Sequence, residues 1–426
     1  MKIMVVGGGG REHTIIRKLA ENKNIEKIYA MPGNGGIAAD AECTGIGATK
    51  IDEIVAFAAD HSIDFAVVAP DDPLAMGCVD RLHAIGIPCF GPVAAAAQIE
   101  ASKVFSKDLM KKYNIPTARY ETFDDPEAAT AYALSGSFPV VVKADGLALG
   151  KGVLICMNAD EAREAIKSIM LDKQFGASGN RVVVEEFLTG PEVSVLAFTD
   201  GKVVKPMVSS MDHKRAGDHD TGLNTGGMGT ISPNPYYTPE IAERCMREIF
   251  LPTIAAMNAE GRSFKGCLYF GLMLTPNGPK VIEYNCRFGD PETQVVLPLL
   301  KSDLLTIMQA CENGTLAETE VEFSTGAACC VIIASGGYPE KYEKGKTISL
   351  NGAEDAENVR VFHSGTALKD GALRTNGGRV LGVTATADDL GSAIQDAYAA
   401  ARKIHFDGMF MRSDIGARAM QALKND

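Results

Sequence analysis

The feature that most constrains this chain is a glycine-rich loop between two short apolar runs. The stretch from Lys143 to Val153 carries three glycines and two lysines. A P-loop needs four residues between its glycines and a Ser or Thr after its lysine, at the start of a helix. Here Gly146 and Gly150 enclose three residues, and another glycine follows Lys151. Because β-branched residues come next, we expect a strand–loop–strand flap that covers phosphates, with an ordinary hairpin as the alternative.

The composition limits the class of protein. A chain of 426 residues is long enough for two to four domains, and 46% hydrophobic with 23% charged residues is typical of a soluble globular protein. The formal net charge of −12 argues against general nucleic-acid binding, which requires a basic face. A phosphorylated ligand must therefore be held by a few focused cations and by backbone amides.

Cysteine usage and hydropathy indicate a cytoplasmic protein. The ten cysteines include no CxxC pair, which is typical of reduced thiols rather than of disulfides or a zinc site. The first residues run straight into glycines, so we expect no signal peptide, and no apolar run approaches the roughly 20 residues of a membrane span. We expect a monomer, with a dimer as the alternative, and neither a membrane nor a nucleic acid as partner.

The first hundred residues alternate apolar runs with helical patterns. The expected elements are strands Ile3–Val6, Lys27–Ala30 and Phe65–Ala69 and helices Glu12–Asn22 and Asp52–His61. This rhythm predicts a parallel sheet with ligand loops beyond the carboxyl ends of its strands. The loop Gly7–His13 suggests dinucleotide binding, but Glu12 replaces the third glycine and no acidic residue ends the second strand. We expect this loop to contact a single phosphate instead, a tight turn being the alternative.

The rest of the chain predicts two further domains. Helices are expected at 102–112, from 126, at 159–171, from about 239 and at 388–404; strands are expected at 119–123, 181–186, 193–199, 268–275, 279–285, 327–334, 359–363 and 379–385. The predicted fold is a multidomain α/β and α+β protein. It has an N-terminal parallel βαβ domain (1–101), a central domain (102–325) with a small lid (about 119–189), and a C-terminal mixed α+β domain (326–426).

The strand Val281–Asn285 predicts a metal site. Side chains alternate along a strand, so Glu283 and Asn285 point to one side while Ile282 and Tyr284 point to the other. Two oxygen ligands beside a phosphate site suit Mg²⁺, which shares its other positions with nucleotide and water. A solvent-exposed polar face is the alternative for these two residues alone. The charged loop that follows, up to Thr293, favours the site.

The stretch Met211–Gly229 has no hydrophobic periodicity and contains four glycines from Gly222 onward. A long polar loop is either disordered or functional, and so long a structureless stretch in a compact domain favours binding. His213 and His219 lack a second pair of closely spaced donors, which argues against zinc.

Together these segments resemble the ATP-grasp superfamily and, within it, the phosphoribosylamine–glycine ligase (glycinamide ribonucleotide synthetase) family. The resemblance runs from end to end, and its last two segments are the most specific. The matching segments are 9–13, 32–34, 143–148, 150–152, 185–188, 212–215, 224–229 and 285–292.

The resemblance implies a role for each matching residue. Those that would contact ATP are Lys103, Lys143, Gly150, Lys151, Gly152, Glu185, Glu186, Leu188 and Glu192, with the adenine read at 185–188 and the ribose held by Glu192. Glu283 and Asn285 would hold Mg²⁺ or Mn²⁺. Those that would contact glycine and phosphoribosylamine are Gly9, Arg11, Glu12, Asn34, Asp212, Lys214, Asn224, Thr225, Gly226, Arg287 and Asp290. Lys143, Lys151 and Arg287 would be catalytic, because they and the metal would carry the γ-phosphate charge.

The implied reaction joins glycine to 5-phosphoribosylamine in de novo purine biosynthesis, with ATP consumed and a glycyl phosphate intermediate. Such phosphoryl transfer needs positioning and charge neutralisation rather than a protein nucleophile. The chain departs from the family pattern at Gly8, at Ala69–Pro73, and in Leu268–Thr275, which offers no acidic metal ligand.

Two other functions are alternatives to this one. One is a different ATP-grasp ligase, such as a carboxylase acting on biotin or a formate-using purine enzyme. A carboxylase would need a bicarbonate and biotin system, which the 212–229 segment does not resemble. An NAD-dependent oxidoreductase or a dinucleotide-binding regulator is disfavoured by Glu12 and by the missing ribose acid. ADP release with and without the two substrates would distinguish all of these.

Overall fold

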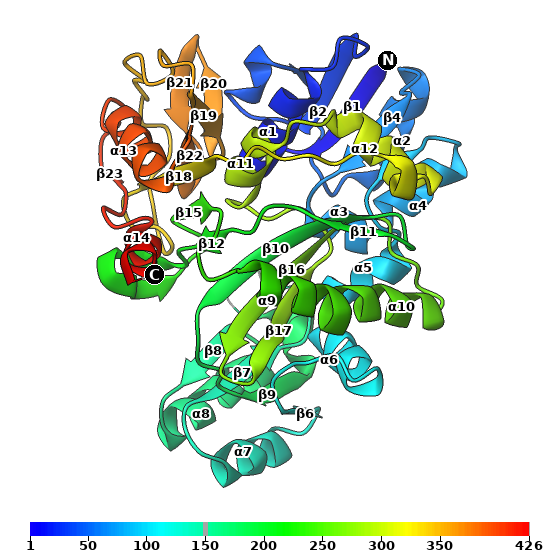
Figure 1. Cartoon of the computed structure of the whole chain (residues 1–426), viewed down its shortest axis with the longest axis vertical. Coiled ribbons are helices and arrows are strands. Elements are labelled where there is room, and N and C mark those ends of the chain that lie inside the picture. The colour runs from blue at the N-terminus through cyan, green and yellow to red at the C-terminus, as the bar shows by residue number, and fades with distance from the viewer. Residues whose placement is uncertain (148–151, 426) are drawn as a thin grey trace.

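The protein is built around four main β-sheets, which a computed structural model describes over residues 1–147 and 152–425 (Figure 1). One sheet forms the N-terminal part, one the small lid, one the centre and one the C-terminal part. Figure 1 places the lid at the far end of the molecule from the N-terminal and C-terminal sheets. This three-part architecture with a lid agrees with the predicted fold class.

The N-terminal sheet is parallel, as predicted, and has the strand order β3-β2-β1-β4-β5. Its strands carry β-branched and apolar residues that are buried throughout β4 and in most of β1, which is typical of a sheet covered on both faces. The elements are β1 (Lys2–Gly7), α1 (Gly10–Leu19), β2 (Lys27–Pro32), β3 (Glu42–Cys43), α2 (Ile51–Asp60), β4 (Phe65–Val68), α3 (Asp71–Ala75), α4 (Cys78–Ala84), β5 (Cys89–Phe90) and α5 (Ala94–Ala101).

The lid is an antiparallel sheet of order β6-β9-β7-β8 with two helices against it. Asp125 and Asn158 cap the amino ends of these helices with their side chains, which fixes where each begins. The lid buries its own apolar cluster, which includes Val142, Ile166 and Val184. Its elements are β6 (Tyr120–Phe123), α7 (Pro126–Ser135), β7 (Val140–Ala144), β8 (Val153–Cys156), α8 (Ala159–Ile166, continued by a π-helical turn Lys167–Leu171) and β9 (Val182–Glu186).

Strands β7 and β8 pair as a hairpin, with Lys143 opposite Val153. The predicted strand–loop–strand unit is therefore confirmed. The predicted phosphate contacts at Gly150 and Lys151 lie outside the described residues.

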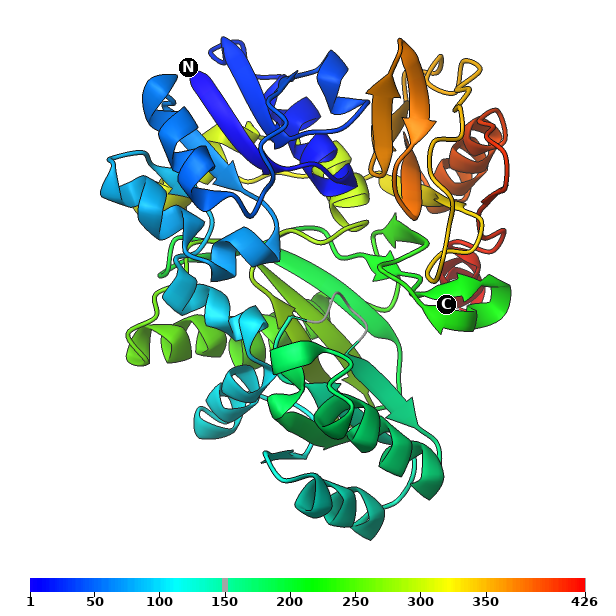
Figure 2. The same ribbon diagram turned by 180° about the vertical axis from the view of Figure 1, so that it is seen from behind.

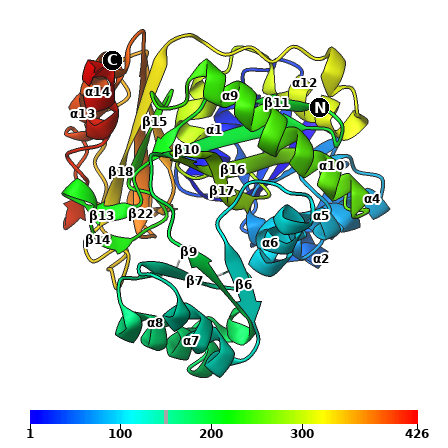
Figure 3. The ribbon, with the colours of Figure 1, turned by 60° about the horizontal axis from the view of Figure 1, so that its bottom comes forward.

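The central sheet has the order β11-β10-β16-β17, and it faces the lid sheet (Figure 3). A bulge interrupts its last pair, because Gly271 lies opposite Glu283 whereas Leu272 lies opposite Val281. Ile282 is the extra residue. The elements of this part are α6 (Lys103–Lys112), β10 (Glu192–Thr199), β11 (Val204–Pro206), α9 (Pro239–Cys245), α10 (Leu251–Ala259), β16 (Gly266–Thr275), β17 (Gly278–Asn285), α11 (Thr293–Val296) and α12 (Leu304–Asn313).

The C-terminal sheet corrects the prediction of a structureless loop at 211–229. Two short strands from this segment, β12 (Met211–Asp212) and β15 (Gly229–Ser232), join the sheet in the order β12-β15-β18-β22-β19. Between them β13 (Arg215–Gly217) and β14 (Thr221–Asn224) form a hairpin. Local periodicity missed these strands because β15 pairs with residues from Ala328 to Val331, far along the chain.

The other strands of this sheet are β18 (Ala327–Ser335), β19 (Val359–His363), β22 (Arg379–Ala387) and β23 (Met409–Phe410), which pairs with β18. The remaining C-terminal elements are β20 (Thr366–Lys369), β21 (Ala372–Thr375), α13 (Leu390–Ala401) and α14 (Ala417–Asn425). Figure 2 shows the β20–β21 hairpin beside the N-terminal part, where Gly35 N donates to Thr366 O at 3.2 Å. Over residues 1–147 and 152–425, none of the helices has both the length and the apolar character that crossing a bilayer requires.

Candidate functional site

A buried cluster of two lysines and one glutamate lies where the lid meets α6. Lys143 of β7 forms an ion pair with Glu185 of β9, and Lys107 Nζ lies 2.5 Å from the second oxygen of Glu185. Burial lowers the pKa of Lys107 to about 8. Burial alone would raise the pKa of Glu185, but Lys143 and Lys107 together hold it below its usual value. One carboxylate thus faces two cations, and the excess positive charge suits an anion.

The base of the flap is fixed against α6. Ser102 caps α6 by accepting from Phe105 N, and its hydroxyl donates to Asp145 of the flap at 2.9 Å. This capping places Lys103 at the first turn, where Nζ donates to Gly146 O at 2.8 Å. Burial is the main cause that lowers the pKa of Lys103. The predicted ATP contacts Lys103 and Lys143 are therefore on adjacent walls.

The strand β17 brings the predicted metal ligands to the lysines. Tyr284 is buried in the core while Glu283 and Asn285 are both partly exposed, as alternation predicted. The bulge turns the Ile282 carbonyl to Lys143 Nζ, at 3.1 Å. Burial alone would raise the pKa of Glu283, but the positive charges of Lys214, Lys143 and Lys103 outweigh this effect, so the pKa lies below its usual value.

Glu100, at the carboxyl end of α5, organises the residues after β17. It accepts from Cys286 N at 2.7 Å and from the Arg287 guanidinium at 2.7 Å. With the Asn285 amide oriented to satisfy its hydrogen bonds, its nitrogen also donates to Glu100, at 3.0 Å. The amide oxygen is then the atom that a cation would meet. Burial raises the pKa of Glu100, and Arg287 opposes that effect.

The donor set fits a magnesium ion. Glu283 and Asn285 supply one carboxylate and one amide oxygen on the same face, which is the small oxygen set that Mg²⁺ uses beside a phosphate group. Within the described ranges no group of three or more His, Cys, Asp and Glu side chains could hold a metal alone. A cation at Glu283 would thus depend on further oxygens from a bound phosphate or from water.

Lys214 lies between the predicted metal ligand Glu283 and the predicted substrate contact Asp212. Its Nζ lies 3.6 Å from Glu283 and 3.8 Å from Asp212. Burial alone would lower the pKa of Lys214. Four neighbouring groups outweigh this effect and hold the pKa well above its usual value: Tyr269, Glu283, Asp212 and Glu192. Burial, with added repulsion from Glu292, raises the pKa of Asp212 to about 8, although Lys214 opposes this.

A second arginine, Arg379 of β22, holds the far wall. Its Nη1 donates to Gly226 O and to Asp290 O, both at 2.8 Å, and its Nη2 lies 3.5 Å from Asp290 Oδ1. Burial would raise the pKa of Asp290, but Arg379 and Arg11 hold it below its usual value. The predicted residues Gly226 and Asp290 are therefore brought together.

The glycine loop after β1 completes this wall. The Glu12 carboxylate caps α1 by accepting from Gly9 N at 2.6 Å and pairs with Arg11 Nε at 2.6 Å. Arg11 also donates from its side chain to Phe288 O, at 3.1 Å, and from its backbone to Asp290, at 3.3 Å. Glu12 is thus placed to shape the loop and to hold Arg11.

Some predicted residues have their side chains used by the protein itself. Asn34 donates to Gly8 O and His363 O, at 2.9 and 2.7 Å, and its oxygen accepts from two backbone amides. Thr225 bonds Lys214 O through both its amide and its hydroxyl. Asn224 lies in the β13–β14 hairpin, opposite Arg215.

The other predicted nucleotide contacts lie along the edge between lid and centre. Glu186 ends β9 and accepts from Arg119 and Lys280. Leu188 is partly buried in the connection that follows, and Glu192 is exposed at the start of β10. Gly152 is buried beside Val153, and its carbonyl accepts from Ala144 N at 2.8 Å.

Sequence reasoning missed Glu100, Lys107 and Arg379. Each is polar yet buried or partly buried among the predicted residues, but each stands in an ordinary helix or strand pattern far from any motif. The nearest available signal is the spacing of Lys107 from Lys103, since residues four apart share a helix face.

Comparisons with known proteins agree along the whole chain. Residues 1–100, 101–293 and 328–418 match the N domain, the ATP-grasp (A) domain and the C domain of phosphoribosylglycinamide synthetase. A phosphoribosylamine–glycine ligase of Vibrio cholerae serotype O1 is 48% identical over 423 residues, which cover 99% of each chain.

Solved structures are similar as well. The crystal structure of a phosphoribosylamine–glycine ligase from Thermotoga maritima superposes with a TM-score of 0.86 at 34% identity, covering 97% of this chain and 100% of that one. The biotin carboxylase domain of a 2-oxoglutarate carboxylase from Hydrogenobacter thermophilus, solved with MgADP, has a TM-score of 0.74 at 16% identity. It covers 96% of this chain and 91% of that one, and it shows the shared fold alone.

Proposed function

Since this chain belongs to the phosphoribosylglycinamide synthetase family, we propose that it joins glycine to 5-phosphoribosylamine through a glycyl phosphate. The family makes it an ATP-grasp ligase that forms a C–N bond in purine biosynthesis. The products are glycinamide ribonucleotide, ADP and phosphate. The observation that carries the proposal is the convergence of Lys143 from the lid sheet, Glu283 from the central sheet and Lys214 from the segment between β12 and β13. We further propose that the protein works in the cytoplasm as a monomer, with a dimer as the alternative.

The ATP side of the site is the junction of lid, α6 and β17. We assign the triphosphate to Lys103 and Lys143, because an uncompensated positive charge remains there after Glu185 is paired. Adenine would lie along 185–188, with hydrogen bonds from backbone groups, since the Glu185 carboxylate is occupied by lysines. Glu192 would hold the ribose. Gly150, Lys151 and Gly152 would cover the phosphates.

Glu283 and Asn285 would hold the metal ion. A divalent ion there, Mg²⁺ or Mn²⁺, supplies neutralisation of phosphate charge during transfer. Glu283 is ionised and ready to bind a cation, because Lys214, Lys143 and Lys103 hold its pKa below its usual value against the effect of burial.

The chemistry proceeds in two displacements. A glycine carboxylate oxygen attacks the γ-phosphorus, the bond to the β–γ bridging oxygen breaks, and ADP leaves. The amine nitrogen of phosphoribosylamine then attacks the acyl carbon, the bond to the phosphate oxygen breaks, and the amine loses a proton to solvent. Lys143, Lys151 and Arg287 would stabilise the negative charge of the transferring group.

The substrate side is formed by the 212–229 segment and the N-terminal loops. Lys214 and Arg287 offer cations to the carboxylate of glycine, while Asp290 offers a carboxylate to an amino group. Asp212, with its pKa of about 8, would become a second carboxylate when that ammonium group binds beside it. Gly9 and Arg11 suit the phosphate of phosphoribosylamine, since backbone amides and one guanidinium gather at the start of α1. Glu12 would take part through Arg11, which it holds in place. Asn34, Asn224, Thr225 and Gly226 would shape this pocket rather than carry charge.

ADP release with each substrate left out in turn tests the function. We expect ADP to form fast only when glycine, phosphoribosylamine and Mg²⁺ are all present, and glycinamide ribonucleotide to form in equal amount. Trapping with hydroxylamine, which converts acyl phosphates to hydroxamates, tests the intermediate. ATP binding without ADP release in the complete mixture would contradict the proposal.

A further inference from the structure

The tip of the 212–229 segment is held in a backbone conformation that needs support. His219 and Asp220 are consecutive non-glycine residues with φ of 56° and 54°. Residues other than glycine rarely adopt this left-handed backbone conformation, and its free-energy cost must be offset by surrounding contacts. The tip is otherwise a two-stranded hairpin, β13–β14, which is too small to be stable by itself.

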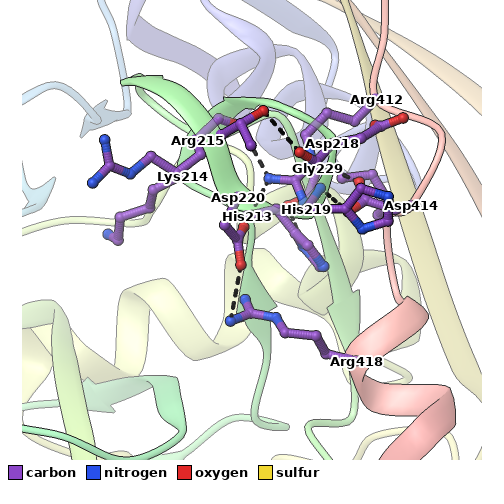
Figure 4. Close-up of polar contacts among 12 residues, drawn as sticks. His213, Lys214, Arg215, Asp218, His219, Asp220, Gly229, Arg412, Asp414 and Arg418 are labelled. Atoms are coloured by element: carbon purple, nitrogen blue, oxygen red, sulfur yellow. Dashed lines mark hydrogen bonds and ion pairs between the residues drawn. The ribbon is translucent and has the colours of Figure 1, made fainter.

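The required contacts come from residues 412–416, which we term the C-terminal clasp (Figure 4). Arg412 is 2% exposed. Its Nη1 donates to Arg215 O at 3.1 Å and to Asp220 Oδ1 at 3.0 Å, while Nε and Nη2 hold both oxygens of Asp414, at 2.7 and 2.8 Å. Asp414 in turn accepts from His219 N at 2.8 Å. The Arg412 guanidinium group therefore holds the tip directly, at Arg215 and Asp220, and indirectly, through Asp414.

The clasp also holds the base of the segment. Gly416 N donates to the buried His213 Nε2 at 3.2 Å, and His213 Nδ1 donates to Gly229 O at 3.1 Å. Gly229 has no room for a side chain, because a Cβ there would lie 2.7 Å from Ile415 Cδ1. His213 is the neighbour of both Asp212 and Lys214, so the clasp reaches the proposed substrate contacts through one residue.

The clasp is itself anchored to the C-terminal fold. The hydroxyl of Tyr398, on α13, donates to Arg412 O at 2.8 Å and accepts from Ile415 N at 3.0 Å. Both ends of the clasp are therefore fixed to a helix that packs on the C-terminal sheet. In Figure 4 the Lys214 side chain points away from Arg412 and Asp414, toward the opposite side of the segment.

We propose that Arg412 is a positioning residue for the ligation: through Arg215 O and Asp220 it fixes the segment that presents Asp212 and Lys214 to glycine and phosphoribosylamine. Arg412 does not touch the substrates, since it faces the opposite side of the segment. This inference rests on the proposed function, in particular on the assignment of Asp212 and Lys214 to the substrate site. ATP, which lies under the lid, does not depend on this support.

Arg412→Ala tests the proposal, with Arg418→Ala as the matched control. Arg418 also reaches Asp220, at 3.3 Å, but it is 55% exposed and makes no contact with Arg215 O. We expect Arg412→Ala to raise the KM for glycine or phosphoribosylamine, or to lower kcat, so that kcat/KM falls about 10- to 100-fold, as for other supporting residues. The Kd for ATP should stay within about twofold, and Arg418→Ala should behave as wild type.

Arg412→Lys gives a second readout. Lysine keeps the charge but cannot bond Asp414 with two parallel donors while also reaching Asp220, so it should recover only part of the lost kcat/KM. An equal loss of ATP affinity and substrate kcat/KM in Arg412→Ala, or no loss at all in a folded protein, would overturn the positioning role. If Arg412→Ala does not fold, Asp220→Asn, which weakens the same contact at the surface, is measured against the same criteria.

Lys214→Met separates this inference from the function on which it rests. Normal substrate kinetics in Lys214→Met would overturn the substrate-site assignment, and the positioning role with it. Impaired Lys214→Met beside an unimpaired, folded Arg412→Ala would overturn the positioning role alone. Impairment in both variants with unchanged ATP binding is the result that we expect.

Discussion

The ammonium group of Lys214 lies 3.6 Å from the carboxylate of Glu283, although the two residues belong to different parts of the fold. Lys214 follows β12 of the C-terminal sheet, and Glu283 lies in β17 of the central sheet. The contact therefore joins the proposed substrate segment to the proposed metal strand. A group on either side of this contact can affect the other, which makes single substitutions here informative.

Glu283→Gln removes the charge that Lys214, Lys143 and Lys103 surround, while the size of the side chain is preserved. We expect the Mg²⁺ concentration for half-maximal rate to rise at least about 10-fold, because an amide is a weaker ligand than a carboxylate. Steady-state rates at saturating ATP across a magnesium titration measure this. Glu121→Gln, at an exposed position on β6, is the control, and an unchanged magnesium requirement in Glu283→Gln would refute the metal assignment.

Arg287→Met leaves Glu100 buried without its guanidinium partner. Breaking a buried pair in this way costs about 3–5 kcal/mol of stability, and loss of a transition-state donor costs roughly 10²–10³-fold in rate. Denaturant unfolding and kcat measure the two effects. In Arg287→Met/Glu100→Gln neither member of the pair is charged, so stability should largely return while the rate stays low. Recovery of both would show that Arg287 acts only through the fold.

Gly227→Ala places a methyl group where there is no space. A Cβ at Gly227 would lie 2.6 Å from Asp212 Oδ1 and 2.5 Å from Pro291 Cδ. We expect Asp212 to be displaced, with about 1–3 kcal/mol lost from stability and a higher KM for the substrates. Gly222→Ala is matched, because Gly222 also has positive φ but its nearest neighbour would be 3.6 Å away. Equal effects in the two variants would assign the loss to backbone strain rather than to Asp212.

Acid should loosen the C-terminal clasp through His213. Burial, together with Arg418 and Arg412, lowers the pKa of His213 to about 4 from 6.5. The unfolded chain then binds more protons between these values, so stability is complete above pH 6.5 and falls as the pH drops toward 4, by about 3 kcal/mol for this residue. Urea unfolding at a series of pH values measures the slope. His213→Gln should reduce it, whereas His61→Gln, at an exposed position, should not.

Much of the fold could be predicted because its strands carry local signals. The apolar runs Ile3–Val6 and Phe65–Ala69, followed by glycine or proline, each became a strand of the parallel sheet within about one residue. Alternation along β17 placed Glu283 and Asn285 on one face. The bulge at Ile282 gave no such signal, because it depends on pairing with β16.

The site was only partly predictable, for a physical reason. Motif residues such as Lys143 and Asp290 stand in or beside recognisable loops, but the residues that hold them are distant in the sequence. Glu100 supports Arg287, and Arg379 supports Asp290, only because the fold brings α5 and β22 to the same place. The 211–229 segment was misjudged for the same reason, since its strands are defined by partners in β18.

The lid keeps most of its buried apolar side chains in a cluster of its own, while Tyr120 and Val183 pack against Val104 of α6. Outward movement of the lid would therefore separate one small apolar contact and several polar ones. The polar contacts include Lys143 to the Ile282 carbonyl, Lys107 to Glu185 and, at the flap base, Lys103 to the Gly146 carbonyl. Phosphate oxygens would offer the Lys143 and Lys103 ammonium groups a better partner than a peptide carbonyl. A bound nucleotide would then replace these carbonyl contacts with stronger ones, so that nucleotide binding and lid closure would occur together.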